Sequence, residues 1–128
     1  MVMVEELTIQ TGGGKYAITL TGILLPEDIQ IVLYGGELPH IGACAFAYQQ
    51  NQAIEVKVMQ APFHREDQLA GDIAKKISEE FACNTCVAAG IHIDNASKAE
   101  IQILLQHTEQ AVDNFINEVK KRRNNRGF

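Results

Sequence analysis

The sequence predicts an α+β fold in which two helices pack on a largely antiparallel sheet of about six strands. Apolar and polar residues alternate in several segments between residues 7 and 59, a pattern typical of strands. The period changes to three or four residues in 65–81 and again after residue 97, as in amphipathic helices. One apolar strand separates these helices. The expected order is therefore five strands, a helix, a strand and a helix.

The first half of the chain contains the five predicted strands. Alternation at residues 7–10 and 16–21, on both sides of the turn TGGGK, predicts a β-hairpin with a glycine turn. The segment 29–34 is rich in β-formers and ends at a double glycine, so it forms the third strand. Residues 42–48 and 53–59 form a second hairpin around QQNQ.

The fourth predicted strand carries small residues on one face. Because side chains alternate along a strand, Ala43, Ala45 and Ala47 share one face, whereas Cys44 and Phe46 share the other. A face of alanines admits close packing of a helix, a partner subunit or a flat ligand. Packing of a helix is the commonest of these three uses.

The first predicted helix covers residues 65–81. Its apolar side chains recur at four-residue spacing, and Glu66 and Asp67 lie in the first turn, where the helix dipole favours acids. The strand that follows, residues 85–93, is apolar on both faces. This pattern places the strand inside the sheet and not at its edge.

The second predicted helix begins at Ser97. Ser97 and Glu100 have the spacing of a capping box, in which each side chain bonds the other residue's backbone N–H. An apolar stripe then extends to about residue 121. The stripe consists of Ile101, Leu104, Leu105, Thr108, Val112, Phe115 and Val119.

The composition indicates one ordinary globular domain, residues 1–128. Hydrophobic residues make up 46% and charged residues 21% of the 128. Five of the eleven basic residues lie in a basic tail from about residue 120, which leaves six basic against sixteen acidic residues before it. We expect no nucleic-acid partner, because an acidic body repels a phosphate backbone. The tail is interpreted as cations at the carboxyl end of a helix.

The chain has no predicted targeting or membrane segment. It begins MVMVEEL, without a basic stretch before a long apolar one, and no run approaches the roughly 18 apolar residues of a membrane span. An odd number of cysteines, three, fits a reducing compartment better than a disulfide framework. We therefore predict a cytoplasmic protein with no membrane partner.

Cys83 and Cys86 form a C-x-x-C motif, which can indicate a zinc knuckle or a redox dithiol. A structural zinc site normally needs a second such pair, and a redox motif normally lies at the amino end of a helix. This motif follows the carboxyl end of a predicted helix. Both cysteines are therefore interpreted as buried apolar residues.

Three histidines lie at the ends of predicted elements. His40 precedes the alanine-faced strand, His64 precedes the first helix, and His92 is close to the end of the interior strand. His107 lies within the second helix, where we expect a surface position. Each histidine taken alone is commonly a capping or hydrogen-bonding residue. Together, His40, His64 and His92 could converge to bind a metal such as zinc or to donate to a phosphate.

Asp94 and Asn95 follow His92 closely. Both residue types favour turns and helix starts, which explains one of them more easily than both. The amino end of the second helix, with Lys98 alongside, could also bind a phosphate. The sequence has no P-loop, serine-hydrolase or zincin motif, so it favours an accessory protein over an enzyme.

Three segments resemble the LpdD-like family of prenylated-flavin chaperones, the accessory proteins of UbiD-type hydroxyarylic acid decarboxylases. They are PHIGACAFA, FHREDQLAGDIAKKI and VAAGIHIDNASKAEIQILL, of which GIHIDNAS is the most specific. The resemblance covers most of the chain from His40 onward. It implies a protein that handles prenylated FMN between a flavin prenyltransferase and a decarboxylase. The cofactor-binding positions implied are His40, Gly42, His64, His92, Asp94 and Asn95.

The resemblance suggests a physical arrangement of the bound flavin. The phosphate would lie at the amino end of the second helix, the histidines and Asp94 would surround the polar edge, and the alanine face would supply flat apolar contact. We expect a homo-oligomer that meets a UbiD-type decarboxylase and a flavin prenyltransferase.

Two other functions stay open. The chain could be a small metal-dependent hydrolase or lyase in which His40, His64 and His92 hold zinc, with Asp94 or Glu66 as the base. It could instead be a dimeric assembly module that presents one face to a larger partner and binds no small molecule.

Overall fold

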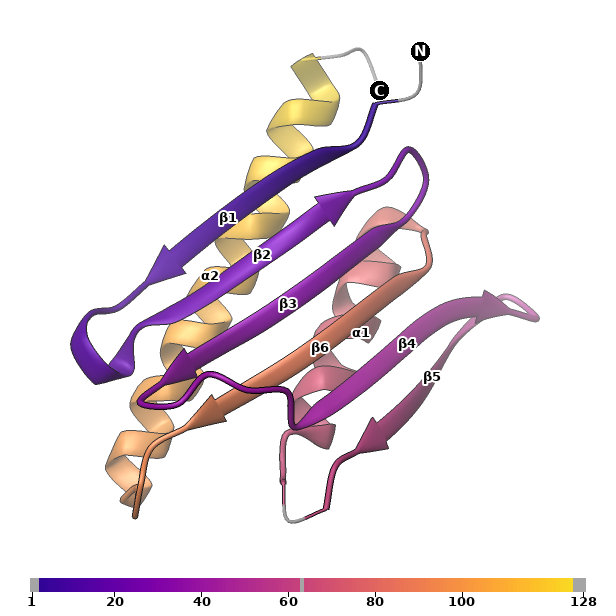
Figure 1. Cartoon of the computed structure of the whole chain (residues 1–128). Coiled ribbons are helices and arrows are strands. Elements are labelled where there is room, and N and C mark those ends of the chain that lie inside the picture. The colour runs from indigo at the N-terminus through magenta and orange to yellow at the C-terminus, as the bar shows by residue number, and fades with distance from the viewer. Residues whose placement is uncertain (1–2, 63, 126–128) are drawn as a thin grey trace.

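The computed structural model of the protein describes residues 3–62 and 64–125. Figure 1 shows a single sheet with two helices beside it. The elements are β1 (Glu5–Thr11), η1 (Gly14–Tyr16), β2 (Ile18–Leu24), β3 (Ile29–Gly36), β4 (Ala43–Gln50), β5 (Ala53–Gln60), α1 (Asp67–Phe81), β6 (Thr85–His92) and α2 (Lys98–Asn125). This confirms the predicted order of five strands, a helix, a strand and a helix, with a short 3-10 helix added between the first two strands.

The strand order in the sheet is β1-β2-β3-β6-β4-β5. The predicted interior position of β6 is confirmed, and its residues Val87 and Ala89 are fully buried. Among the described residues β6 pairs in parallel with β3, while the remaining strand pairs are antiparallel. The sheet is therefore mixed. The parallel pair arises because the chain leaves β3, builds a hairpin and a helix, and returns by a crossover, as parallel strands require.

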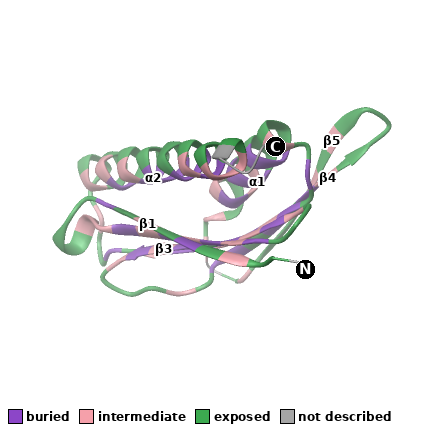
Figure 2. Ribbon diagram, turned by 90° about the horizontal axis from the view of Figure 1, so that it is seen from above, coloured by how far each residue is buried: buried purple, intermediate pink, exposed green. Residues whose placement is uncertain are grey.

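Both helices lie on the same face of the sheet (Figure 2). Helix α1 packs on β4, β5 and β6, and α2 packs on β1 and β2. The alanine face of β4 lies under α1, and Ala43, Ala45 and Ala47 are at most 2% exposed. Packing of a helix on this face is thus confirmed. The expectation that the same face offers flat contact to a flavin is wrong, because the helix covers it.

Helix α2 begins with the predicted capping box. The N–H of Ser97 donates to Glu100 Oε1 at 3.0 Å, and the N–H of Glu100 donates to Ser97 Oγ at 3.1 Å. Arg122 and Arg123 lie in its last turn, where cations interact favourably with the helix dipole. Within the described residues, neither helix is long and apolar enough to cross a membrane.

We expected His107 on the surface, but the structure shows it half-buried on α2. Its Nδ1–H donates to the carbonyl of Tyr16 at 2.7 Å, and the hydroxyl of Thr11 donates to the carbonyl of His107 at 2.7 Å. The sequence places His107 among polar helix residues. The connection between β1 and β2 covers the His107 side chain, although it is distant from His107 in the sequence.

Cys83 and Cys86 point to different sides of the sheet. Cys83 is buried, with its Sγ 3.5 Å from the hydroxyl of Thr85 on the helix side. Cys86 lies on the open face, where its Sγ is 3.9 Å from that of Cys44. Burial raises the pKa of the Cys83 thiol, which disfavours the thiolate that zinc or redox chemistry needs. Burial of Cys83 is as predicted, whereas Cys86 is only half-buried.

Candidate functional site

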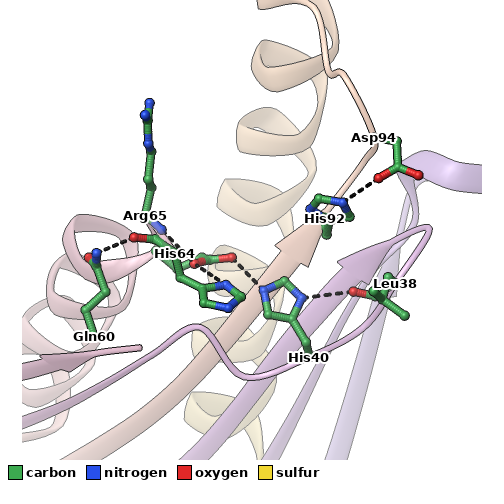
Figure 3. Close-up of polar contacts among 8 residues, drawn as sticks. Leu38, His40, Gln60, His64, Arg65, His92 and Asp94 are labelled. Carbon is green, nitrogen blue, oxygen red and sulfur yellow. Dashed lines mark hydrogen bonds and ion pairs between the residues drawn. The ribbon is translucent and has the colours of Figure 1, made fainter. Parts of the chain in front are cut away.

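The three predicted histidines converge at one end of the sheet, where several strands begin or end (Figure 3). The ring centroids of His40 and His64 are 4.7 Å apart, and those of His40 and His92 are 6.1 Å apart. The topology explains this meeting. Strands β3, β5 and β6 end there and β4 begins there, so His40 before β4, His64 after β5 and His92 at the end of β6 lie close together.

Glu66 joins two of these histidines. Its Oε1 lies 2.9 Å from Nε2 of His40, and its Oε2 lies 3.8 Å from Nδ1 of His64. The N–H of Arg65 also donates to Oε2, at 3.0 Å. Glu66 is the N-cap residue of α1 and not a first-turn residue as predicted, and its side chain makes no capping bond. The carboxylate therefore contacts His40 and His64 and does not cap the helix.

Two glycines allow this close arrangement. A Cβ at Gly42 would overlap the Glu66 carboxylate, and a Cβ at Gly90 would overlap the carbonyl of His40. Gly42 is buried, and its N–H donates to the carbonyl of Ala89 at 2.9 Å. Gly42, expected to approach a ring system, has the Glu66 carboxylate as its close neighbour. Gly90 was not predicted, although a glycine inside an apolar strand is a known signal of close backbone approach.

Asp94 and Asn95 have different roles in the turn after β6. The Nε2 of His92 lies 2.7 Å from Asp94 Oδ1, and the backbone N–H of Asp94 donates to Glu37 Oε1 at 3.2 Å. Asn95 has φ of 52°, in the left-handed region that asparagine tolerates better than most residues. The turn thus explains Asn95, whereas Asp94 orients a histidine.

The amino end of α2 already carries an anion. Glu100 accepts hydrogen bonds from the Ser97 N–H, from Lys15 Nζ at 3.0 Å and from the Tyr16 hydroxyl at 3.0 Å. These donors, the Ser97 N–H first, lower the pKa of Glu100 to about 2. A phosphate placed here would meet an ionised carboxylate. We therefore do not place the ligand phosphate at this helix end.

This pKa shift predicts a pH-dependent contribution to stability. A carboxylate with an ordinary pKa of 4.5 and a folded-state pKa of about 2 stabilises the fold above pH 4.5, and this effect is lost as pH falls through 2. Glu100→Gln keeps a capping acceptor but lacks the charge. Its melting temperature should therefore lie below the wild-type value at pH 7, and this difference should shrink between pH 4.5 and 2.

Thermal unfolding followed by circular dichroism across this pH range measures the difference. Lys15→Met removes one partner of Glu100 and should show a smaller difference of the same sign. A difference between wild type and Glu100→Gln that stays constant from pH 7 to 2 would contradict the assignment.

A pocket of about 390 Å³ lies beside the histidines, between the start of α1, the end of β6 and the first turns of α2. Its rim includes His64, Arg65, Glu66 and His92. The side chain of Arg65 extends away from the imidazoles in Figure 3. The wall is apolar and consists of Leu69, Ile91, Ile93, Ala96, Ile101, Leu104 and Leu105.

Three wall residues, Ile101, Leu104 and Leu105, belong to the apolar stripe that we predicted for this helix. Ile101 and Leu105 are 45% and 42% exposed, whereas Leu104 in the same turns is 6% exposed. The sequence shows Ile101 and Leu105 as apolar helix positions, but it does not show that they lack a core partner. They and the rim residue Arg65 were missed as site residues.

A larger pocket, of about 820 Å³, lies at the opposite end of the sheet. It is bordered by the β2–β3 connection, the end of α1 and the last turns of α2. None of the predicted site residues lines it. We place the functional site at the smaller pocket, because the predicted histidines converge beside it and His64 and His92 line it.

The chain is similar to known proteins over most of its length. Residues 12–120 match the family described as prenylated flavin chaperone LpdD-like domain. Protein LpdD of Lactiplantibacillus plantarum is 30% identical over 96 residues, which cover 73% of this chain and 71% of that protein. A chain in the crystal structure of a chaperone complex for yeast 20S proteasome assembly has a TM-score of 0.63. It matches at 12% identity over 92% of this chain and 96% of that chain, which shows a shared fold.

Proposed function

Because the chain belongs to the LpdD-like prenylated flavin chaperone family, we propose that it binds prenylated FMN and supplies it to a UbiD-type decarboxylase. Family membership confirms the resemblance predicted from the three motifs, and it supports a chaperone role for a UbiD-type enzyme. The flavin is the specific part of the proposal. One observation carries it: three histidines converge beside an apolar-walled pocket, and two of them, His64 and His92, line its rim.

The pocket suits a flat ring with a polar edge. Its volume falls in the range of roughly 300–1,000 Å³ typical of small-molecule sites, which combine apolar walls with a few placed polar groups. The wall would contact the ring and its prenyl addition, while His64 and His92 would meet the polar edge. Arg65 is the cation of the rim and would pair with the phosphate.

The remaining predicted residues would act through these contacts. His40 and Asp94 hold the rim by their bonds to Glu66 and His92. Gly42 makes room for Glu66, and Asn95 shapes the turn. None of these roles requires catalysis, so the proposal is a protein that carries a flavin and does not transform it.

The exposed part of the wall fits a protein that must release its ligand. Ile101 and Leu105 line the pocket yet remain more than a third exposed. A ring bound against them would keep one side accessible to a receiving enzyme. A flavin prenyltransferase would supply the ring, and the decarboxylase would receive it.

Filling the pocket tests this function. When co-expressed with a flavin prenyltransferase, the purified chain should show flavin absorbance and the mass of prenylated FMN. Ala96→Phe adds a ring to the wall and should reduce the retained flavin by about tenfold or more.

Gln49→Phe is the matched control, because it adds the same ring at the other pocket and should leave retention unchanged. The proposal fails if the wild-type chain retains no flavin, or if Ala96→Phe retains as much as Gln49→Phe does.

The predicted homo-oligomer stays part of this proposal. The sheet face opposite the helices is not covered by either helix (Figure 2). Val32, Phe46 and Met59 are exposed on it by 37%, 43% and 79%, and its charged residues Glu55 and Lys57 lie, like Met59, on the edge strand β5. An uncharged apolar centre can face its own copy without burying charge. Light scattering of the purified chain measures its molar mass and so tests whether it is a homo-oligomer.

A further inference from the structure

The contact between His40 and Glu66 requires a proton or a cation between the two side chains. Nδ1 of His40 lies 2.9 Å from the carbonyl oxygen of Leu38, and a carbonyl only accepts, so Nδ1 carries a hydrogen. A neutral ring then has a lone pair on Nε2. That lone pair lies 2.9 Å from Glu66 Oε1, which also has only lone pairs when ionised. A proton or a metal ion must lie between these two atoms.

The surroundings favour a metal ion in that place. Ligand atoms of His40, His64 and Glu66 all lie within 4.8 Å of one another. Two atoms that are each about 2.1 Å from one ion are about 3.0–3.4 Å apart at octahedral or tetrahedral angles. Nε2 of His40 lies 2.9 Å from Glu66 Oε1, and Nδ1 of His64 lies 3.8 Å from Glu66 Oε2, so an ion between the two histidines would take both carboxylate oxygens, or one of them after the side chains rotate.

Further contacts match those of a metal site. A metal-bound histidine commonly donates its other ring N–H to a carbonyl, as His40 does to Leu38. The side chains of His40 and Glu66 are only 18% and 12% exposed, so water screens them weakly. The Arg65 N–H orients the second carboxylate oxygen.

We propose that His40, His64 and Glu66 bind one divalent ion of the zinc class. Two imidazoles and one carboxylate form a known zinc set, which leaves a coordination position for water or for an oxygen donor. The set differs from the predicted one because Nε2 of His92 bonds Asp94. The ion would lie beside the pocket rim, to which His64 and Glu66 also belong.

Zinc titration of the full chain tests this site. The chain is produced without a flavin prenyltransferase, stripped with a chelator, dialysed, and titrated with zinc chloride against a chromogenic chelator at pH 7.5. We expect one zinc per chain. Glu66→Gln, which has the same shape, and His64→Ala should each weaken binding by about tenfold or more. Zinc should also raise the melting temperature of the wild type more than that of Glu66→Gln.

His92→Ala is the matched control, because it removes a neighbouring imidazole and should leave the affinity within about threefold. Absence of zinc binding by the wild type overturns the site. Equal binding by Glu66→Gln would show adventitious zinc, and a loss in His92→Ala as large as that in Glu66→Gln would show a different ligand set. Because no flavin is present, these outcomes are independent of the flavin proposal.

Discussion

Replacing Phe115 with alanine should lower the free energy of unfolding by about 3–5 kcal/mol. Phe115 is fully buried in α2 where the helix packs on the sheet. A Cβ at Gly22 of β2 would overlap its ring, so the ring lies directly on the strand backbone. Because Gly22 has no side chain to move into the space, the cavity would persist. Denaturant unfolding followed by circular dichroism measures the change.

Two variants bracket this result. Phe115→Leu keeps most of the volume and should cost clearly less than the alanine variant. Asn117→Ala changes an exposed position of the same helix and should stay within about 0.5 kcal/mol of wild type. A cost below about 1 kcal/mol for Phe115→Ala would show that this ring is not a central contact between α2 and the sheet.

Replacing Gly90 with alanine should disrupt the histidine cluster while the fold persists. The added Cβ would overlap the carbonyl of His40, and backbone atoms cannot rotate away as a flexible side chain can. Gly90 lies in the interior strand β6, so the His40 connection must move instead. We expect a loss of about 1–3 kcal/mol in stability and a decrease of about tenfold or more in retained flavin. Thermal unfolding and flavin absorbance measure the two effects.

The same substitution at Gly13 provides the control. A Cβ there meets no atom within 4 Å, and the backbone φ of −150° suits any residue. Gly13→Ala should therefore change stability by no more than about 0.5 kcal/mol and leave flavin retention unchanged. If Gly90→Ala retains as much flavin as Gly13→Ala does, the position of His40 does not matter for binding.

The features predicted correctly depend on short stretches of sequence. The capping box needs only Ser97 and Glu100, three residues apart, and its bonds form as predicted. Alternation identified both hairpins, and the apolar character of β6 on both faces identified its interior position. In each case the periodicity of a single element contains the information.

The features predicted wrongly depend on elements that are far apart in the chain. His107 is covered by the connection between β1 and β2, and α1 covers the alanine face, which leaves no room there for the expected flavin contact. The sheet is largely antiparallel, as predicted, but the sequence did not show that β3 and β6 within it pair in parallel, because this pairing depends on the path of an intervening hairpin and helix. No local pattern states which of several possible partners an apolar or polar face meets.

The secondary-structure elements, the interior strand, the family resemblance and the three histidines at the ends of elements can all be read from the order of the residues. Three features follow only from folding: the histidines lie close together, Glu66 joins His40 and His64 while His92 pairs with Asp94, and Ile101 and Leu105 face a pocket. The two groups of features differ in the distance along the chain over which they are encoded. Backbone periodicity acts over a few residues, whereas a site requires the crossover that brings β6 between β3 and β4.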